Sequence, residues 1–292
     1  DEMAILPGME ELANLLYIVS YYDSGDWDVI IVDCAPTGET LRFLSFPEIM
    51  HWWMERWLLT GRAAATITRP LLKRTLGIPM PSDKVFQSAE ELFEQLDRMH
   101  TLLTDPQVSS VRLVVNPEKM VIKEAQRTFT YLNLYGYFTD LVILNRLIPD
   151  SVDDPYFDFW KRSQERYREM VEERFSPIPI LIAPLMEEEV VGTRMLKAMA
   201  ETIYQDDDPT KIFFHGQPHD VEREDSYYVL SLDLPFIAKE EISLLRSGDE
   251  LIIQVGSYRR NIILPRALLG LKVKEAKFEE RRLRIRLEAS TR

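Results

Sequence analysis

The sequence predicts part of a doubly wound, mostly parallel α/β sheet with a helical insertion, followed by a small all-β antiparallel sandwich. Three mostly apolar runs have the pattern of strands in a parallel sheet, and helix-like segments separate them; the runs are Val29–Val32, Val111–Asn116 and Leu141–Asn145. Beyond residue 224, six short and partly alternating strands follow one another within about 65 residues, separated by turn signals. The chain therefore divides into residues 1–206, a linker at 207–224 and residues 225–292.

Composition limits the function. The 292 residues give room for two domains, and 46% hydrophobic with 28% charged residues is typical of a soluble globular protein. A net charge of −13 argues against a nucleic-acid partner, and the sequence has no apolar run of about 18 residues that would mark an integral membrane protein. The single cysteine, Cys34, and an acidic amino terminus unlike a signal peptide predict a cytoplasmic protein.

The first strand-like run leads to a candidate phosphate site. An amphipathic helix starting at Met9 precedes the run, and the run ends on Asp33. A carboxylate at the carboxyl end of a parallel strand lies where α/β sheets bind ligands, and the turn at residues 35–38 would point backbone N–H groups into the same crevice. The alternative is that Asp33 only caps the next helix.

The stretch DCAPTGETLRFLSFP, residues 33–47, resembles the second switch of the ArsA-type P-loop ATPases. This family includes the arsenite-pump ATPase and the targeting factor for tail-anchored proteins. The resemblance implies that Asp33 helps to hold Mg²⁺ and the attacking water near the γ-phosphate of ATP. It also implies that Pro36, Thr37 and Gly38 sense that phosphate. Glu39 stands where many relatives carry histidine.

A complete ATPase of this kind needs a Gly-rich loop that ends in Lys and Ser or Thr, because its amides and ammonium group cradle the phosphates. No Gly-Lys pair occurs in the 292 residues. In the ArsA family this loop lies roughly a hundred residues upstream of the second switch, about the scale of a domain. We therefore expect an N-terminally truncated ATPase domain that is inactive alone; the alternative is a degenerate relative that does not hydrolyse ATP.

Residues 37–106 are predicted to be mostly helical, with a helical subdomain at about 48–106. Within it, Trp52, Ile67 and Leu71 are candidates for a groove that binds an apolar client segment. The targeting factor carries such a groove in a helical insertion after the same switch, so the resemblance favours a client site here. Ordinary core and interhelix packing is the alternative.

The later strands carry candidates for the adenine side of an ATP site. Asn145 ends the run VILN, which resembles the family's adenine-side strand, and its amide has both a donor and an acceptor. The segment PLMEEEVVG, residues 184–192, resembles the loop that closes over the adenine, which implies contacts from Pro184, Leu185 and Val190. The alternatives are a common turn asparagine and three glutamates that form the first turn of a helix.

Residues 205–224 break the periodicity and are rich in Asp and Pro, which is typical of a domain boundary. The strands after them resemble the α-crystallin or small heat-shock domain, from SGDELIIQV to RRLRIRL. Ala276 and Leu283 match that family's turn motif, whereas Arg281 replaces its glycine. Within the 292 residues, no I-x-I motif follows the last predicted strand.

Together these features predict an ATPase, using ATP and Mg²⁺, that couples hydrolysis to binding or delivery of a protein or anion client. The resemblance implies a homodimer. Arsenite is disfavoured as cargo because trivalent arsenic requires two or three thiolates and Cys34 is the only cysteine. The alternative is a non-hydrolysing scaffold that acts through its α-crystallin-like domain.

Overall fold

The computed structural model describes residues 9–34, 83–216, 219–224, 227–247, 250–263 and 271–289. The chain divides into two compact units. The first unit combines residues Asp1–Thr104 with Glu240–Leu271, and the second combines Asp105–Lys239 with Lys272–Arg292. The α-crystallin-like region therefore contributes strands to both units.

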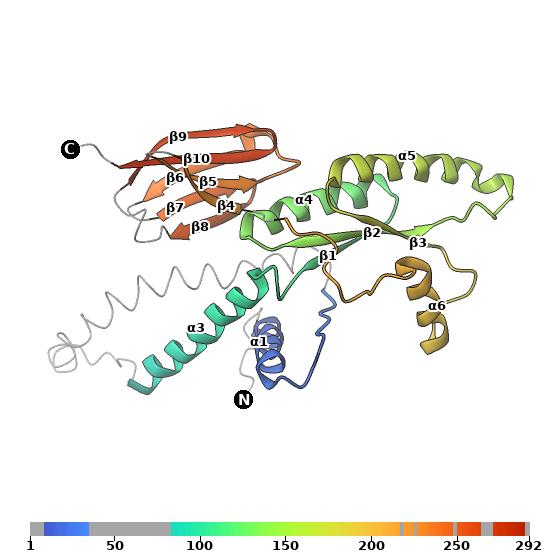
Figure 1. The fold of residues 1–292 in the computed structure, drawn as a ribbon, viewed down its shortest axis with the longest axis horizontal. Helices are drawn as coiled ribbons and strands as arrows, with labels where there is room; N and C mark the ends of the chain where they lie inside the picture. The colour runs from blue at the N-terminus through green and yellow to red at the C-terminus, as the bar shows by residue number, and fades with distance from the viewer. Residues whose placement is uncertain are drawn as a thin grey trace, which may run out of the picture. The chain divides into compact units, whose positions relative to one another are not determined.

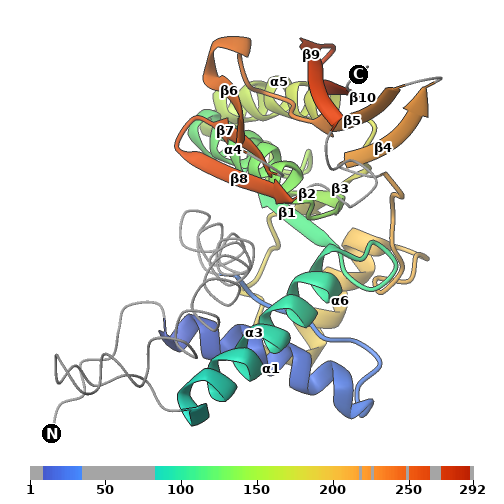
Figure 2. The same cartoon turned by 90° about the vertical axis from the view of Figure 1, so that its left-hand side faces the viewer.

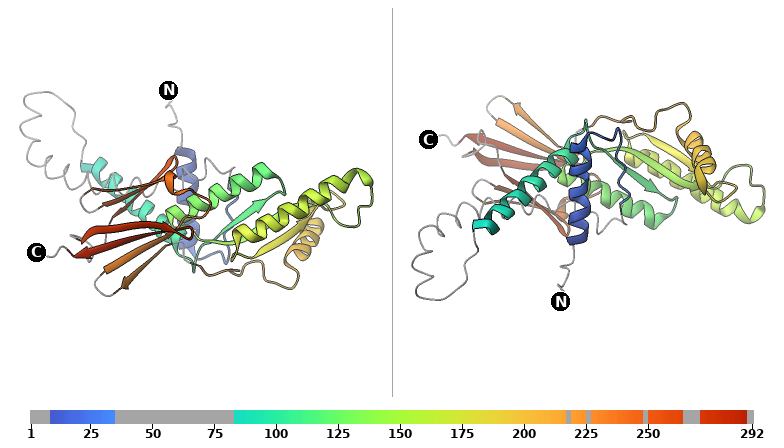
Figure 3. Two further views of the ribbon diagram at one scale, coloured as in Figure 1. Left: turned by 90° about the horizontal axis from the view of Figure 1, so that it is seen from above. Right: turned by 90° about the horizontal axis from the view of Figure 1, so that it is seen from below.

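Among its described residues, the first unit contains the α-helices α1 (Met9–Ser24) and α3 (Asp83–Thr104). They lie side by side (Figures 2 and 3), and Val19 of α1 packs in one apolar core with Leu96 and Met99 of α3. Arg98 donates to Asp23 across this contact, with 3.0 Å between Nε and Oδ2. The predicted helix from Met9 is confirmed, and α3 confirms the helical prediction for residues 83–104.

The predicted strand Val29–Val32 is wrong for this structure. These residues follow α1 without regular secondary structure, and the exposed fractions are 48% for Val29, 89% for Ile31 and 47% for Val32. A strand of this apolar pattern is buried when it pairs into a parallel sheet whose faces helices cover. No strand among the described residues pairs with this segment, so its apolar side chains remain in contact with solvent.

A three-stranded antiparallel sheet completes the described part of the first unit: β6 (Ile242–Ser247), β7 (Glu250–Val255) and β8 (Tyr258–Ile263), in the order β6-β7-β8. The short helix η2 (Lys239–Glu241) precedes it. Leu251, Ile253 and Val255 of the central strand are fully buried, and they alternate as the period of a strand requires. The predicted strands in this region are confirmed.

The second unit contains the parallel sheet, in the order β1-β2-β3, with α4 and α5 on one face and α6 on the other (Figure 1). Its elements are β1 (Val111–Val115), α4 (Lys119–Tyr135), β2 (Thr139–Leu147), η1 (Pro155–Phe157), α5 (Asp158–Phe175), β3 (Ile180–Pro184) and α6 (Gly192–Tyr204). The central strand β2 buries Leu141, Val142 and Leu144 completely, which confirms the predicted buried strand.

A four-stranded antiparallel sheet also belongs to the second unit. Its strands are β4 (His219–Glu224), β5 (Tyr227–Asp233), β9 (Leu271–Glu279) and β10 (Arg282–Ala289), in the order β4-β5-β10-β9. Leu232 pairs with Leu283 and Leu230 with Ile285, and all four side chains are buried. Strand β4 was not expected, because HDVERE contains one apolar residue, Val221, and so lacks a readable alternation.

The segment before β4 is bound to the parallel sheet. Arg112 of β1 donates to the carbonyl oxygens of Pro209 (2.6 Å) and Lys211 (2.9 Å). Asp140 of β2 has a fully buried side chain and accepts from the backbone N–H of Phe213 at 3.1 Å. The arginine and the aspartate lie 3.5 Å apart, so one ion pair holds residues 209–213 against two strands.

The four-stranded sheet is fastened to the α/β layer after β5. The ring of Phe236 lies 6.1 Å from that of Phe129 in α4 and 5.4 Å from that of Phe175 in α5, measured between centroids. The Thr130 hydroxyl of α4 donates to the carbonyl oxygen of Pro235. Phe236 has a φ of 66°, an unusual value for an aromatic residue, which requires surrounding contacts to hold it.

Candidate functional site

The carboxyl ends of β2 and β3 bring two predicted site regions together. Asn145, half-buried near the end of β2, pairs with Ala183, and Leu147 pairs with Pro184, the last residue of β3. The backbone N–H of Leu185 donates to the Leu147 carbonyl oxygen at 2.7 Å and continues the ladder. The asparagine and the start of the predicted adenine loop are therefore neighbours at the edge where parallel sheets bind ligands.

The loop that follows β3 keeps apolar side chains accessible. Leu185 is 49% exposed, Val190 is half-buried, and the three consecutive glutamates at 187–189 are exposed. Helix α6 begins only at Gly192, which has a φ of 75°, and no acidic residue lies in its first turn. The alternative that the glutamates form that turn is wrong; they belong to the loop, where Glu188 accepts from Arg194 at 3.1 Å.

Two residues that the sequence interpretation missed shape this edge. The pairing of β2 with β3 shifts register between Asn145 and Leu147, and Arg146 adopts a left-handed φ of 59°. Gln164 of α5 binds both backbone groups of Ile148, the residue after Leu147. Its Oε1 accepts from the Ile148 N–H at 2.9 Å, and its Nε2 donates to the Ile148 carbonyl oxygen at 2.8 Å. The only sequence signal for Arg146 is a charge inside an apolar run; Gln164 has none.

The switch candidates are described only in part. Asp33 lies in the exposed, irregular segment after α1, and Cys34 follows it. Pro36, Thr37 and Gly38 lie outside the described residues, as do the groove candidates Trp52, Ile67 and Leu71. Within the described ranges, no group of three or more His, Cys, Asp or Glu side chains could hold a metal ion. The Mg²⁺ role of Asp33 therefore stays a prediction.

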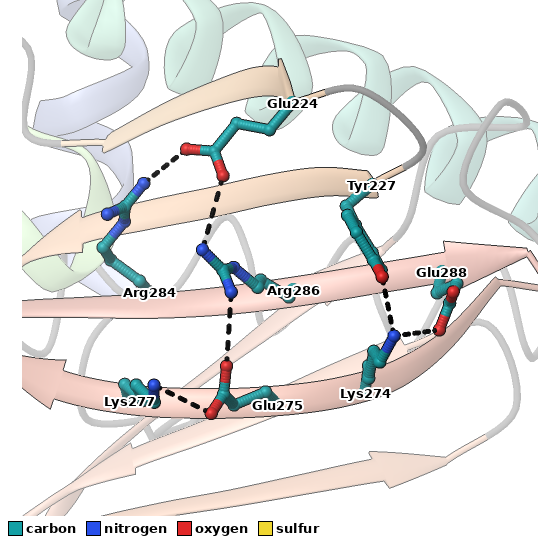
Figure 4. A network of polar contacts seen from close by, with 8 residues as sticks. All are labelled: Glu224, Tyr227, Lys274, Glu275, Lys277, Arg284, Arg286 and Glu288. Atoms are coloured by element: carbon teal, nitrogen blue, oxygen red, sulfur yellow. Dashed lines mark hydrogen bonds and ion pairs between the residues drawn. The ribbon is translucent and has the colours of Figure 1, made fainter.

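A second polar cluster covers one face of the four-stranded sheet (Figure 4). Arg286 bridges Glu224 (3.6 Å) and Glu275 (3.5 Å), while Arg284 contacts Glu224 at 2.6 Å. Lys274 donates to the Tyr227 hydroxyl at 2.7 Å and lies 3.0 Å from Glu288. Two hydrogen bonds raise the pKa of Lys274: the larger effect comes from the bond to Tyr227 and the next from the bond to Glu288. Each of these cations thus contacts a carboxylate.

None of the helices in the described ranges combines the length and the hydrophobicity that crossing a lipid bilayer requires.

Comparison with known proteins identifies the family. Residues 1–205 match the family described as "Anion-transporting ATPase", and residues 225–287 match the "HSP20-like domain found in ArsA". A protein from Aquifex aeolicus named "Putative arsenical pump-driving ATPase 1" is 41% identical over 284 residues, which cover 96% of this chain and 72% of that protein.

Two further relatives extend the comparison. A "Putative arsenical pump-driving ATPase" from Chlorobaculum tepidum is 38% identical over 288 residues, 98% of this chain and 71% of that protein. The "ATPase get3" of Pyrenophora tritici-repentis is 26% identical over 202 residues, 68% of this chain and 60% of that protein. The chain belongs to the ArsA-type P-loop ATPase family and carries the HSP20-like domain found in ArsA.

Proposed function

We propose that this chain supplies the adenine side and the second switch of an ATPase that couples ATP hydrolysis to binding or delivery of a client. The observation that carries the proposal is the pairing of β2 with β3. It places Asn145 beside the loop at 184–190, at the ligand edge of a parallel sheet. Membership in the ArsA-type family supports ATP as the nucleotide.

The adenine side follows from residue chemistry. The Asn145 amide offers a donor and an acceptor, which match the amino group and ring nitrogen on the edge of adenine. Pro184, Leu185 and Val190 supply apolar surface for the face of the base. The 49% exposure of Leu185 suits a side chain that a planar ligand covers.

The switch side rests on the family resemblance of residues 33–47. Asp33 would orient the attacking water and help to hold Mg²⁺, while Pro36, Thr37 and Gly38 would respond to the γ-phosphate. Bound Mg²⁺ supplies charge neutralisation at the phosphates. A single carboxylate fits such an outer role, because Mg²⁺ in nucleotide sites keeps several waters and takes its other ligands from phosphate.

The phosphate cradle is not encoded in the 292 residues, since they contain no Gly-Lys pair. The proposal therefore requires a cradle from outside them, and this requirement is testable in the gene. A Gly-rich loop ending in Gly-Lys-Thr, in the reading frame upstream of Asp1, would support the ATPase. A reading frame that encodes no such loop would favour a non-hydrolysing protein.

The role of Asp33 is tested in a protein that contains both the cradle and these residues. We expect Asp33→Asn to abolish ATP turnover and to leave equilibrium binding of ATP nearly unchanged. The carboxylate is needed more in the transition state than in the ground state. Normal ATP turnover in the Asp33→Asn variant would indicate that Asp33 only caps the next helix.

The client and the assembly are proposed from the family. We propose that Trp52, Ile67 and Leu71 bind a hydrophobic segment of a client protein. We also propose that the ATPase is a homodimer in the cytoplasm. An arsenical cargo, which the names of two relatives indicate for those proteins, fits poorly because Cys34 is the only thiol.

A scaffold that acts through the HSP20-like domain is the second candidate function. The observation that favours it is the attachment of the four-stranded sheet to α4 and α5 through Phe236, which needs no nucleotide. A scaffold would bind its client with the same affinity in the presence and absence of ATP. An ATPase would change that affinity with the nucleotide.

A further inference from the structure

Arg146 occupies a special position at the end of β2. It lies between Asn145 and Leu147, where the pairing with β3 shifts register, and its φ of 59° places it in the left-handed region. A non-glycine residue in this region costs free energy and persists only where its surroundings fix it. Such residues concentrate at ligand sites.

Hydrogen bonds on the carboxyl side of Arg146 fix this bulge. The carbonyl oxygen of Leu147 accepts from Leu185 at 2.7 Å. Both backbone groups of Ile148 are bound by the Gln164 amide, at 2.9 and 2.8 Å. The strand therefore cannot slip into regular pairing without the loss of these contacts, so the bulge is part of the folded edge.

The bulge leaves a cation accessible at this edge. The Arg146 side chain is exposed, and it makes no hydrogen bond or ion pair with the other described residues. In the neighbouring loop, Glu188 is engaged by Arg194. A bulge re-aims the side chain that it carries. An exposed arginine thus directly follows, in the sequence, the asparagine proposed to hold adenine.

We propose that Arg146 stacks its guanidinium on the adenine ring whose edge Asn145 binds; this inference rests on the proposed function. A guanidinium is planar and weakly hydrated, and it stacks on aromatic faces as an ammonium does not. Asn145 would read the edge of the base, while Arg146 covers one face of it. Arg146 is then a binding residue for the base, with no role in the chemical step.

The test uses adenosine and AMP as probes, with dissociation constants from ligand-observed NMR at millimolar concentrations. We expect Arg146→Ala to weaken both ligands equally, by about fivefold, as the loss of a partly exposed cation–π contact predicts. Arg146→Lys should weaken both by nearly as much. Arg127→Ala, which removes an exposed arginine of α4, is the control and should change neither constant.

Two results for Arg146→Ala would overturn the stacking. One is an unchanged affinity for adenosine in Arg146→Ala. The other is a loss confined to AMP, which would show that the arginine contacts phosphate. Arg146→Gly separates binding from folding, because glycine adopts the left-handed conformation without strain. We expect it to raise the Tm and still weaken adenosine about fivefold, to the level of Arg146→Ala; full affinity in this variant would also overturn the inference.

Asn145→Ala distinguishes this inference from the proposed function. If Asn145→Ala weakens adenosine binding and Arg146→Ala does not, the stacking fails and the adenine site stands. If the wild-type chain binds neither probe, the adenine site fails, and the stacking fails with it.

Discussion

Strand β2 and the segment Val29–Asp33 share one sequence pattern and have opposite structures. The run Leu141–Asn145 within β2 and the segment Val29–Asp33 consist mainly of β-branched and aliphatic residues, and each ends on a polar side chain, Asn145 or Asp33. In β2, Leu141, Val142 and Leu144 are fully buried, whereas Ile31 is 89% exposed. The pattern predicts a buried strand for both segments and is correct for one.

The difference lies in the neighbours. β2 pairs with β1 on one side and with β3 on the other, and helices cover both faces of the sheet. No described residue offers such a partner to Val29–Val32. An apolar run thus favours a buried strand, but the strand forms only where neighbouring strands are available to pair with it.

The largest expected effect compares one side chain from each segment. Leu144→Ala should lower the free energy of unfolding by roughly 4 kcal/mol, because a fully buried leucine leaves a cavity between sheet and helix. Ile31→Ala should change it by less than about 0.5 kcal/mol. Urea denaturation of both variants measures the two values. A cost at Ile31 close to that at Leu144 would show that the first segment is buried in solution.

The next effect concerns the buried carboxylate that holds the segment before β4. Asp140→Ala should cost about 3 kcal/mol, since it leaves Arg112 without its charge partner and the Phe213 N–H without its acceptor. Asp140→Asn keeps an acceptor for the N–H and should cost less. Thermal unfolding of the two variants gives the order. Equal costs would mean that charge, rather than the hydrogen bond to Phe213, carries the contact.

These elements show what the sequence could and could not predict. Periodicity predicted α1, β1, α4 and β2, because local apolar patterns follow the geometry of helices and strands. It missed β4, whose single apolar residue, Val221, gives no alternation. It also missed the binding of residues 209–213 by Arg112 and Asp140. That contact joins residues about 70 to 100 positions apart, and no local pattern encodes it.

The candidate site divides in the same way. Asn145 and Pro184 were predicted as site residues from the sequence motifs around them and from their positions at strand ends. In the structure, their strands pair with each other. Arg146 and Gln164 were not predicted. A left-handed residue and a side-chain amide that binds one peptide unit depend on the tertiary environment, and the same residue types occur throughout helices and strands elsewhere.

The Gln164 contact gives a smaller prediction. Gln164→Ala should lower the free energy of unfolding by about 1–2 kcal/mol, because it removes two hydrogen bonds to Ile148 in a partly buried position. Gln164→Glu can still accept from the Ile148 N–H but cannot donate to its carbonyl oxygen. The stability of this variant should therefore lie between that of wild type and that of Gln164→Ala. Chemical denaturation measures this order. A Glu variant worse than the Ala variant would contradict the assignment of the amide.

The smallest effect is the exposed ion pair between α1 and α3. The hydrogen bond from Arg98 lowers the pKa of Asp23. The folded-state pKa is then below the unfolded one, so the pair stabilises the fold above the ordinary aspartate pKa and loses this effect as the pH falls through the lowered value. Wild type should be slightly more stable than Asp23→Asn at neutral pH and equal to it in acid. A difference that grows in acid would contradict this sign.

We propose that these residues form an adenine-binding edge and that the 292 residues contain no phosphate cradle. Titration calorimetry, supported by ligand-observed NMR for weak binding, compares adenosine with Mg-ATP on the unmodified chain. We predict weak dissociation constants of the same order for the two ligands, because only the base finds partners. A micromolar constant for Mg-ATP beside a millimolar one for adenosine, a gap of about 4 kcal/mol, would contradict the claim. Such a result would place a phosphate site within the 292 residues.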